Sequence, residues 1–353
     1  MGFLRRFLFL GILSVALFAF AEGLFSMAIV SYNVIFRTAP LLPDRARRYV
    51  QYDEQLGWSP RPNLHIRDMW GRGVDLTTSS QGFLGDTYFD PVVPKTKVRI
   101  VCSGDSFTEG TGVAPEHTWC RRLAEMDHRF EVVNMGVGGY GLDQAYLRYR
   151  RDGNLLEHHI HLFAFIADDL DRMKHREFWG YPKPVLRIEN GALVPHNVPV
   201  PRVRFYRPKL VQAAAYIQGL KTAEFLQNLF NSKSSRERVT DDDIRALALR
   251  VFEELNQISK ARGIILSLVL LPEQREYAGG RIDMWRQFFR TQTAKNGIFF
   301  VDLIDEYRAM PRAEAKELFL RGPSDVAGHL SVKGNRFIAQ ALYPKLLAHG
   351  GVA

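Results

Sequence analysis

The sequence is poor in cysteine, in metal-binding motifs and in clustered basic charge. Its two cysteines, Cys102 and Cys120, are too few to infer a disulfide bond, although an oxidising compartment would allow one. The histidines at 158, 159 and 161 lack the paired spacing of a metal site, and we interpret them as a solvated surface cluster. The net charge is +9, yet no long lysine or arginine block and no nucleic-acid-binding motif is present. We therefore expect no bound metal and no nucleic-acid partner.

The N-terminus contains a long apolar run. Phe7 to Phe36 is almost uncharged, with Glu22 as the exception, and it exceeds the ~20 residues that span a bilayer. Ala19-Phe20-Ala21 resembles a signal-peptide cleavage site, but the chain stays apolar beyond it. We therefore interpret residues 1–37 as an uncleaved membrane anchor, in preference to a signal peptide.

The charges on either side of this run bear on its orientation. Arg5 and Arg6 favour a cytoplasmic N-terminus, whereas several arginines on the other flank weaken that argument. Charges before a first span usually dominate. The sequence thus predicts a single-pass protein of the inner (cytoplasmic) membrane with its main domain outside.

The rest of the chain divides into a flank, 38–97, and a main domain, 98–353. The flank combines a linker with a Gly-, Pro- and aromatic-rich region, which we interpret as short strands and turns. In the main domain, apolar strands alternate with helices, which predicts a central parallel sheet with covering helices. The expected strands are 98–103, 131–136, 161–167, 264–271 and 298–302, and the expected helices are 119–126, 142–151, 241–262, 281–296, 312–319 and 332–347.

The main domain contains a long insertion, 171–240, after its third strand. It carries an Asn190-Gly191 hairpin signal and an expected helix over 210–230. Because it leaves the carboxyl edge of the sheet, it should overhang that edge. It is either a lid or substrate platform, or a stabilising decoration.

Gly104-Asp105-Ser106 is the most informative motif. It follows the β-branched run 98–103, so Ser106 lies at a strand-to-helix corner. Backbone N–H groups at a new helix N-terminus favour negative charge beside it. Such a corner can expose a nucleophilic Oγ and stabilise the oxyanion that it generates. The alternative is an ordinary helix start capped by Asp105 or Ser106.

A serine nucleophile needs a base, and His329 follows Asp325 near the C-terminus. Histidine can take the serine proton while a carboxylate fixes its orientation. Two further strands end in glycines, 136–141, and in Asp168-Asp169. The carboxyl ends of parallel strands share one edge, where sites of α/β proteins assemble.

These motifs and their order resemble the SGNH (GDSL-type) hydrolase family, from Val98 to the C-terminus. The first block of the family carries its serine within Gly-Asp-Ser, matched at Ser106. Its second block supplies a glycine N–H to the oxyanion hole. The Asn-x-Gly-x-x-Gly pattern of 134–139 assigns that role to Gly139.

Two blocks depart from the family pattern. The third is Gly-x-Asn-Asp, and its asparagine donates to the oxyanion; here 166–169 reads Ile-Ala-Asp-Asp, so Asp168 stands in place of that asparagine. The last is Asp-x-x-His, which here is one residue longer, from Asp325 to His329. The stretch 330–339 looks like the closing helix of the family.

The resemblance implies a three-layer α/β/α flavodoxin-like fold and hydrolysis of carboxylic esters without a cofactor. Ser106 would attack the carbonyl, His329 would relay the proton and Asp325 would orient His329. The N–H groups of Ser106 and Gly139 would hold the oxyanion, with Asp168 in the third position.

An outward-facing anchored enzyme suggests O-acetyl groups on a cell-envelope or exported polysaccharide as the ester substrate. Two alternatives stay open. One is an O-acyltransferase that uses the same triad, and the other is a degenerate domain that acts as a binding or assembly factor.

Overall fold

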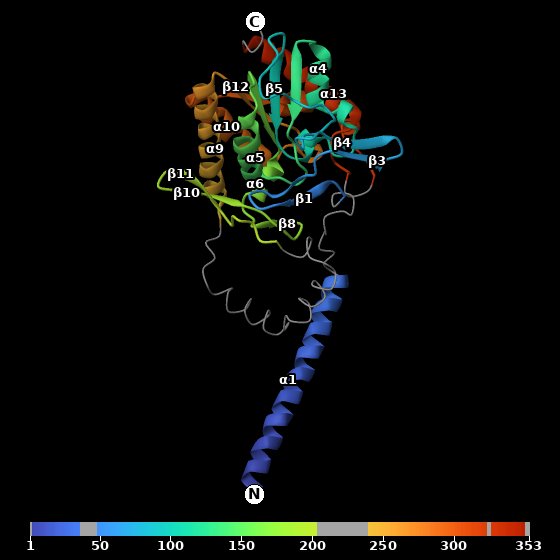
Figure 1. Cartoon of the computed structure of the whole chain (residues 1–353), viewed down its shortest axis with the longest axis vertical. Coiled ribbons are helices and arrows are strands. Elements are labelled where there is room, and N and C mark those ends of the chain that lie inside the picture. Colours follow the sequence, from blue (N-terminus) through green and yellow to red (C-terminus); the bar gives the residue numbers. More distant parts are fainter. Residues whose placement is uncertain (1, 36–47, 203–238, 323–325, 350–353) are drawn as a thin grey trace. The chain divides into compact units, whose positions relative to one another are not determined.

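The computed structural model describes residues 2–35, 48–202, 239–322 and 326–349 of the chain (Figure 1). It separates the chain into two units: residues 1–41 with 202–239, and residues 42–201 with 240–353. The helix expected over 210–230 and the candidate triad acid Asp325 lie outside the described residues.

The first unit contains the N-terminal helix α1 (Gly2–Ile35). Within it, Arg5–Ala28 is long and apolar enough to cross a membrane, by length and composition, as a signal sequence would also be. The helix continues through Glu22, which accepts a hydrogen bond from Ser26 Oγ, one turn later, at 3.2 Å. The apolar helix is therefore compatible with the predicted anchor.

The second unit is built on a five-stranded parallel sheet. Its spatial order is β13-β12-β7-β5-β6. Counted along the chain this is 2-1-3-4-5, the flavodoxin-like order that the sequence predicts, with its reversal between β5 and β7. The strands are β5 (Val98–Ser103), β6 (Phe130–Asn134), β7 (Ile160–Phe165), β12 (Ile265–Leu270) and β13 (Phe299–Asp302).

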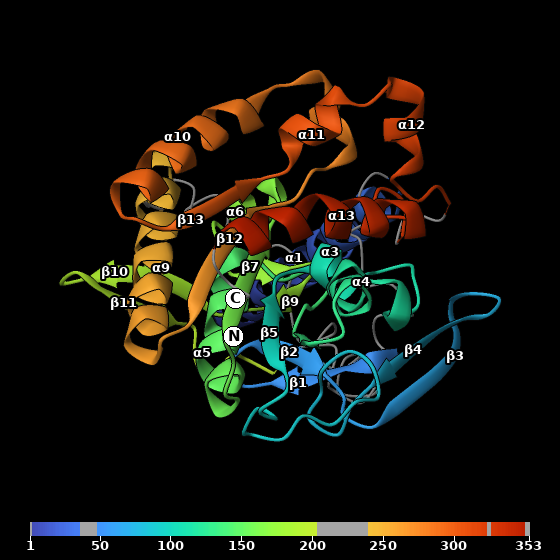
Figure 2. The same ribbon diagram turned by 90° about the horizontal axis from the view of Figure 1, so that it is seen from above.

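Helices cover both faces of this sheet (Figure 2). One apolar core lies under α5 (Leu142–Asp152), α9 (Asp241–Arg262) and α10 (Arg281–Lys295). The opposite core lies under α4, α11, α12 and α13. All six residues of β7 are buried, as expected for a strand covered on both sides. The predicted three-layer fold is confirmed. The helices of the second face are α4 (Trp119–Met126), α11 (Ile304–Ala309), α12 (Arg312–Glu317) and α13 (Val332–Ala348).

Local sequence explains where the longer helices begin and end. Thr240 caps α9 by accepting a hydrogen bond from the Asp243 N–H, and the left-handed Gly263 ends the helix. Ser331 caps α13 in the same way through Gly334 N–H. The helix α12 is two residues shorter than expected, because Phe319 leaves it to pair with Leu330.

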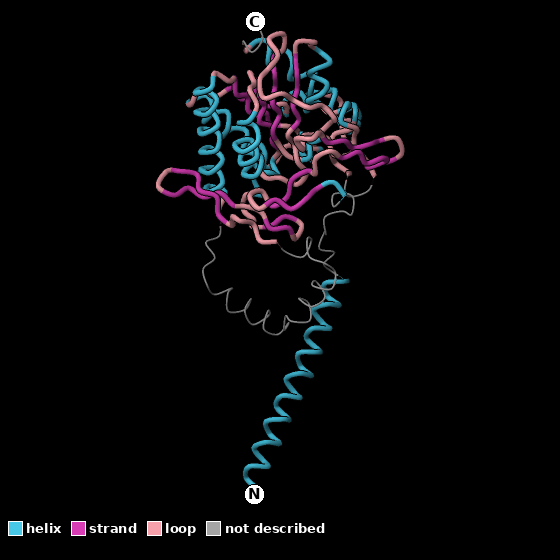
Figure 3. Tube along the Cα trace, viewed as in Figure 1, coloured by secondary structure: helices cyan, strands magenta, loops and turns pink. Residues whose placement is uncertain are grey.

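Short hairpins surround the sheet. The flank forms β1 (Val50–Asp53) with β2 (Gly57–Pro60), and β3 (Leu64–Gly71) with β4 (Val74–Thr78), as expected. The insertion begins with β8 (Glu177–Phe178) paired to β9 (Tyr181–Pro182), followed by β10 (Val185–Glu189) paired to β11 (Ala192–His196). Figure 3 shows that β3–β4 and β10–β11 project from opposite sides of this unit.

The Asn190-Gly191 signal is confirmed. Both residues have positive φ, +51° and +77°, as a type I′ turn between two strands requires. The remaining short elements are α3 (Ser106–Glu109), α6 (Ala167–Arg172) and the 3₁₀ turns η1 (Pro115–His117), η2 (Gly153–Leu155) and η4 (Gln274–Ala278).

The expected surface cluster of histidines is wrong for two of its three members. His161 lies inside β7, buried, with its ring stacked on Tyr149 at 3.6 Å. His158 is also buried, with Nε2 3.0 Å from the Tyr149 hydroxyl, and burial lowers its pKa to about 4. Both are packed core residues. Cys102 and Cys120 are buried free thiols.

We expect the full-length protein to sediment with membranes and to remain there after alkaline carbonate extraction, because burying Arg5–Ala28 in a bilayer removes a continuous apolar surface from water. A fragment that begins at residue 48 is the control and should be soluble. Release of the full-length protein by carbonate would contradict the membrane span, and a mature N-terminus at Glu22 would establish a cleaved signal peptide.

Candidate active site

The corner between β5 and α3 places Ser106 at the carboxyl edge of the sheet. Asp105 caps α3, with Oδ1 accepting from the Phe107 N–H at 2.9 Å. Gly104 cannot carry a side chain, because a Cβ there would lie 2.7 Å from the Ala164 carbonyl oxygen of β7. Ser106 itself is 5% exposed. The capping role expected as the alternative is thus real, and it falls to Asp105 rather than to the serine.

His329 lies against this serine, although 223 positions separate the two in the sequence. Its Nε2 is 2.9 Å from Ser106 Oγ. Its Nδ1 is 3.1 Å from the Val326 carbonyl oxygen, so a proton on Nδ1 can be donated to that oxygen. The tautomer assigned in this way leaves Nε2 as the acceptor for the serine proton.

Ser106 has a second acceptor beside it. Asp105 Oδ2 lies 3.2 Å from Ser106 Oγ, so the single hydroxyl proton can be donated to Asp105 or to His329 at any one time. Arg172 donates to the same carboxylate oxygen at 3.2 Å, so this oxygen is shared between the serine hydroxyl and the guanidinium.

The predicted oxyanion glycine lies in a tight turn after β6. The Tyr140 N–H donates to the Val137 carbonyl at 3.3 Å, and Gly139 has a φ of +78°. This is the pattern of a type II turn, in which the third residue must tolerate positive φ. A Cβ at Gly139 would also lie 2.7 Å from the Phe178 ring. Glycine is therefore required there for backbone and steric reasons alike.

Asp168 lies in the first turn of α6, directly after β7. Its side chain is 41% exposed and forms an ion pair with Arg275, whose guanidinium also lies 3.0 Å from Glu273. The neighbouring Asp169, and not Asp168, accepts from the Ile166 N–H that precedes the helix. Asp168 is thus bound to a cation from the segment after β12.

Arg172 is a site component that sequence reasoning missed. Its Nη1 lies 3.2 Å from Asp105 Oδ2, 2.7 Å from the Tyr140 carbonyl and 2.6 Å from Asp169 Oδ1. One guanidinium thereby joins the segments that follow β5, β6 and β7. The sequence signal was only an arginine three positions after Asp169, a spacing that is also common on helix surfaces.

Two glutamates after β12 were also missed. Burial, with a further contribution from Asp168, raises the pKa of Glu273 to about 7. Burial and Glu273 together raise the pKa of Glu276 to about 8. This acidic group consequently carries less negative charge near neutral pH than its composition suggests. Within the described part of the chain, no group of His, Cys, Asp or Glu is arranged to hold a metal ion.

An aromatic pair lies beside Gly139. Phe178 and Trp179 are half-buried and stacked, with ring centroids 4.6 Å apart, and Arg172 lies 4.9 Å from the centroid of Phe178. Trp179 has a φ of +51°, which is rare for a bulky residue. Such strain costs roughly 1–3 kcal/mol and is characteristic of functional segments.

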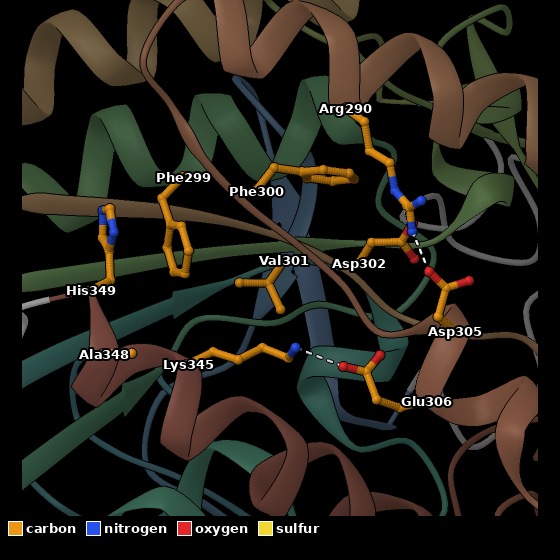
Figure 4. A pocket seen from close by; sticks show the side chains of 10 residues that line it. All are labelled: Arg290, Phe299, Phe300, Val301, Asp302, Asp305, Glu306, Lys345, Ala348 and His349. Atoms are coloured by element: carbon orange, nitrogen blue, oxygen red, sulfur yellow. Dashed lines mark hydrogen bonds and ion pairs between the residues drawn. The ribbon is translucent and has the colours of Figure 1, made fainter.

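A separate groove of about 480 Å³ lies along the edge strand β13 (Figure 4). Two ion pairs cross it, Lys345–Glu306 at 2.6 Å and Arg290–Asp305 at 2.5 Å. Asp302 accepts a hydrogen bond from the Ile304 N–H at 3.0 Å. None of the predicted site residues lines this groove.

No family model matches the sequence, and no curated protein matches it. Similar solved structures include a lipolytic protein of the G-D-S-L family from Desulfitobacterium hafniense (16% identity, 70% of this chain, 99% of that chain, TM-score 0.38).

Two others are an acetyl xylan esterase, AlAXEase (16% identity, 70% of this chain, 100% of that chain, TM-score 0.40), and TesA (12% identity, 70% of this chain, 97% of that chain, TM-score 0.41). The chain is thus similar to solved GDSL-type lipolytic proteins and esterases. At such identities and TM-scores, the assignment of chemistry depends on the geometry of the site itself.

Proposed function

We propose that this protein is a serine ester hydrolase. The observation that carries the proposal is the 2.9 Å contact between Ser106 Oγ and His329 Nε2 at the carboxyl edge of a 2-1-3-4-5 parallel sheet. Nucleophile and base within hydrogen-bond reach are the signature of covalent acyl transfer. The two residues required for this step come from opposite ends of the main domain, so they come into contact only in the folded protein.

The reaction proceeds through an acyl-enzyme. Ser106 Oγ attacks the ester carbonyl while its proton passes to His329 Nε2, and His329 then returns the proton to the leaving alcohol. Water, activated by the same histidine, releases the acid. The Val326 carbonyl holds the proton on Nδ1, and Asp325 is the proposed carboxylate that stabilises the charged imidazole. The mechanism uses no cofactor.

The proposed oxyanion hole consists of the N–H groups of Ser106 and Gly139, with Asp168 in the third position. Within the described residues, neither of these N–H groups donates a hydrogen bond to the protein. A carboxylate at Asp168 carries no N–H to donate, whereas the guanidinium of Arg275 bound to it does. We propose that Asp168 limits the rate of hydrolysis, partly offset by Arg275.

The proposed substrate is an O-acetyl ester on a cell-envelope or exported polysaccharide. The Phe178–Trp179 pair beside Gly139 supports it, because a flat aromatic face can receive the apolar face of a sugar ring. The location proposed for the enzyme fits this substrate: a single span in the inner membrane with the catalytic domain outside. Transfer of the acyl group to a sugar hydroxyl in place of water would use the same triad.

Ser106 is expected to be the residue that a fluorophosphonate probe modifies, because His329 can accept its proton. Ser106→Ala should abolish labelling without unfolding the protein. His329→Ala should lower ester turnover by several orders of magnitude. His128→Ala is the control and should retain activity. Labelling of the Ser106→Ala variant would refute the assignment, and absence of any labelling would favour a degenerate binding domain.

Replacement of Asp168 by asparagine is expected to raise kcat for a soluble ester about tenfold near neutral pH, because it supplies an N–H donor to the oxyanion. Arg275→Gln should lower kcat, since it leaves the Asp168 carboxylate without its cation. Steady-state kinetics of both variants measure these effects. An unchanged or lower kcat for Asp168→Asn would show that Asp168 does not occupy an oxyanion-donor position.

Trp179→Ala should raise KM for an acetylated oligosaccharide by a few fold to about tenfold, because a stacking surface is lost. A small aryl acetate serves as the matched substrate, and its KM should stay unchanged. Assays with and without a glycan acceptor also separate hydrolysis from acyl transfer. Equal changes for the two substrates would argue against a saccharide-binding face.

A further inference from the structure

The turn that carries Gly139 is held by a residue far from the motifs of the main domain. Trp58 of β2 donates its indole Nε1–H to the Gly138 carbonyl at 3.0 Å. That carbonyl and the Gly139 N–H belong to the same peptide group. Because the peptide is trans, the two bonds point in opposite directions. A donor bound to the carbonyl therefore fixes the direction in which the Gly139 N–H points.

The orientation of this peptide is a choice between two states. Type I and type II turns differ mainly by a rotation of about 180° of the central peptide, and the type II state needs a residue that tolerates positive φ. A Gly138-Gly139 pair permits both states, so glycine alone does not select one. The hydrogen bond from Trp58 is made to the carbonyl in the observed, type II state. A flip would break it and turn the Gly139 N–H away.

A second contact holds the preceding peptide. The Gly138 N–H donates to Glu109 Oε1 at 3.1 Å, and Glu109 follows Ser106 on α3. Glu109 is 2% exposed and also accepts from Tyr49 at 2.8 Å and from Thr111 at 2.6 Å. Burial raises its pKa. The turn is thereby tied to the helix that carries the serine.

Trp58 is itself rigidly placed. It is 1% exposed, its ring packs edge-on against Tyr140 at 5.6 Å, and its carbonyl accepts from the Tyr140 hydroxyl at 2.5 Å. The neighbouring Leu56 carbonyl accepts from Gln144 of α5 at 2.8 Å. The indole therefore has no other rotamer available without disrupting this packing.

We propose that Trp58 is a positioning residue for the oxyanion hole: it locks the Gly138–Gly139 peptide in the orientation that presents the Gly139 N–H to the substrate. The bound carbonyl also polarises the peptide, which strengthens the N–H as a donor. The inference deepens the proposed hydrolase function and rests on it. Through Trp58, the flank of residues 38–97 thus helps to position the oxyanion hole.

The test is Trp58→Phe, which keeps an aromatic ring and removes the N–H donor. We expect kcat to fall about tenfold, less than the 10²–10³ for deletion of an oxyanion donor, with KM changed by less than about twofold. Affinity for a trifluoromethyl ketone, whose adduct carries an oxyanion, should fall by the same factor as kcat. Trp285→Phe, a buried residue of α10 that is not part of the proposed site, is the matched control and should leave kcat unchanged.

A second variant guards against loss of fold. Incorporation of benzothienylalanine at position 58 replaces the indole N–H by sulfur and preserves the shape of the ring. It should reproduce the drop in kcat with an unchanged thermal midpoint. An unchanged kcat in this variant would overturn the role of Trp58. A change in KM without a loss of affinity for the trifluoromethyl ketone would overturn it as well. If the wild type lacks both turnover and probe labelling, the hydrolase proposal itself fails.

Discussion

The guanidinium of Arg172 holds the loop segments of the site together. It reaches Asp105 before the serine, the Tyr140 carbonyl in the glycine turn and Asp169 in the helix after β7. Each partner follows a different strand, and the strands β5 and β7 flank the point where the sheet order reverses. Without the cation, Asp105 and Asp169 would face each other as buried like charges, a costly arrangement. The spacing of the three loop segments, and the compensation of the charges of Asp105 and Asp169, thus depend on the side chain of Arg172.

The site combines this rigid centre with a more adaptable rim. Ser106, Glu109 and Trp58 are almost fully buried and tied by hydrogen bonds on several sides. Asp168 and Arg275 are much more exposed. Buried groups of this kind fix geometry to within a fraction of an ångström, whereas exposed ion pairs rearrange at low cost. Asp168, the residue at which the sequence departs from the Gly-x-Asn-Asp motif, belongs to this exposed rim.

Local patterns predicted the framework well. β5 was expected over 98–103 and α9 over 241–262, and both ranges agree with the structure. Each is specified by residues next to it: a β-branched run that ends in glycine, and a Thr240 cap with Gly263 at the other end. The predicted strand order needed one further step, the resemblance of the motifs to a known fold family.

The contacts that were missed join residues far apart in the chain. Trp58 and Gly138 are 80 positions apart, and Arg275 and Asp168 are 107 apart. Nothing in the local sequence distinguishes these residues from ordinary core or surface positions. The histidines at 158 and 161 were misjudged for a related reason, since the aromatic partner that buries them, Tyr149, belongs to the preceding helix. Sequence periodicity indicates which face of a helix or strand is apolar. It does not indicate which polar groups of distant segments contact each other in the fold.

The groove along β13 has a consequence for solubility. An edge strand offers unpaired backbone groups to any other extended chain, and exposed edges of this kind promote aggregation. β13 has only four residues, and His349 stacks over Phe299 at 3.8 Å near its start. The Lys345–Glu306 and Arg290–Asp305 pairs place charge along the rest of the groove. An incoming strand would have to strip water from both pairs, so this edge discourages the sheet from extending into a neighbouring molecule.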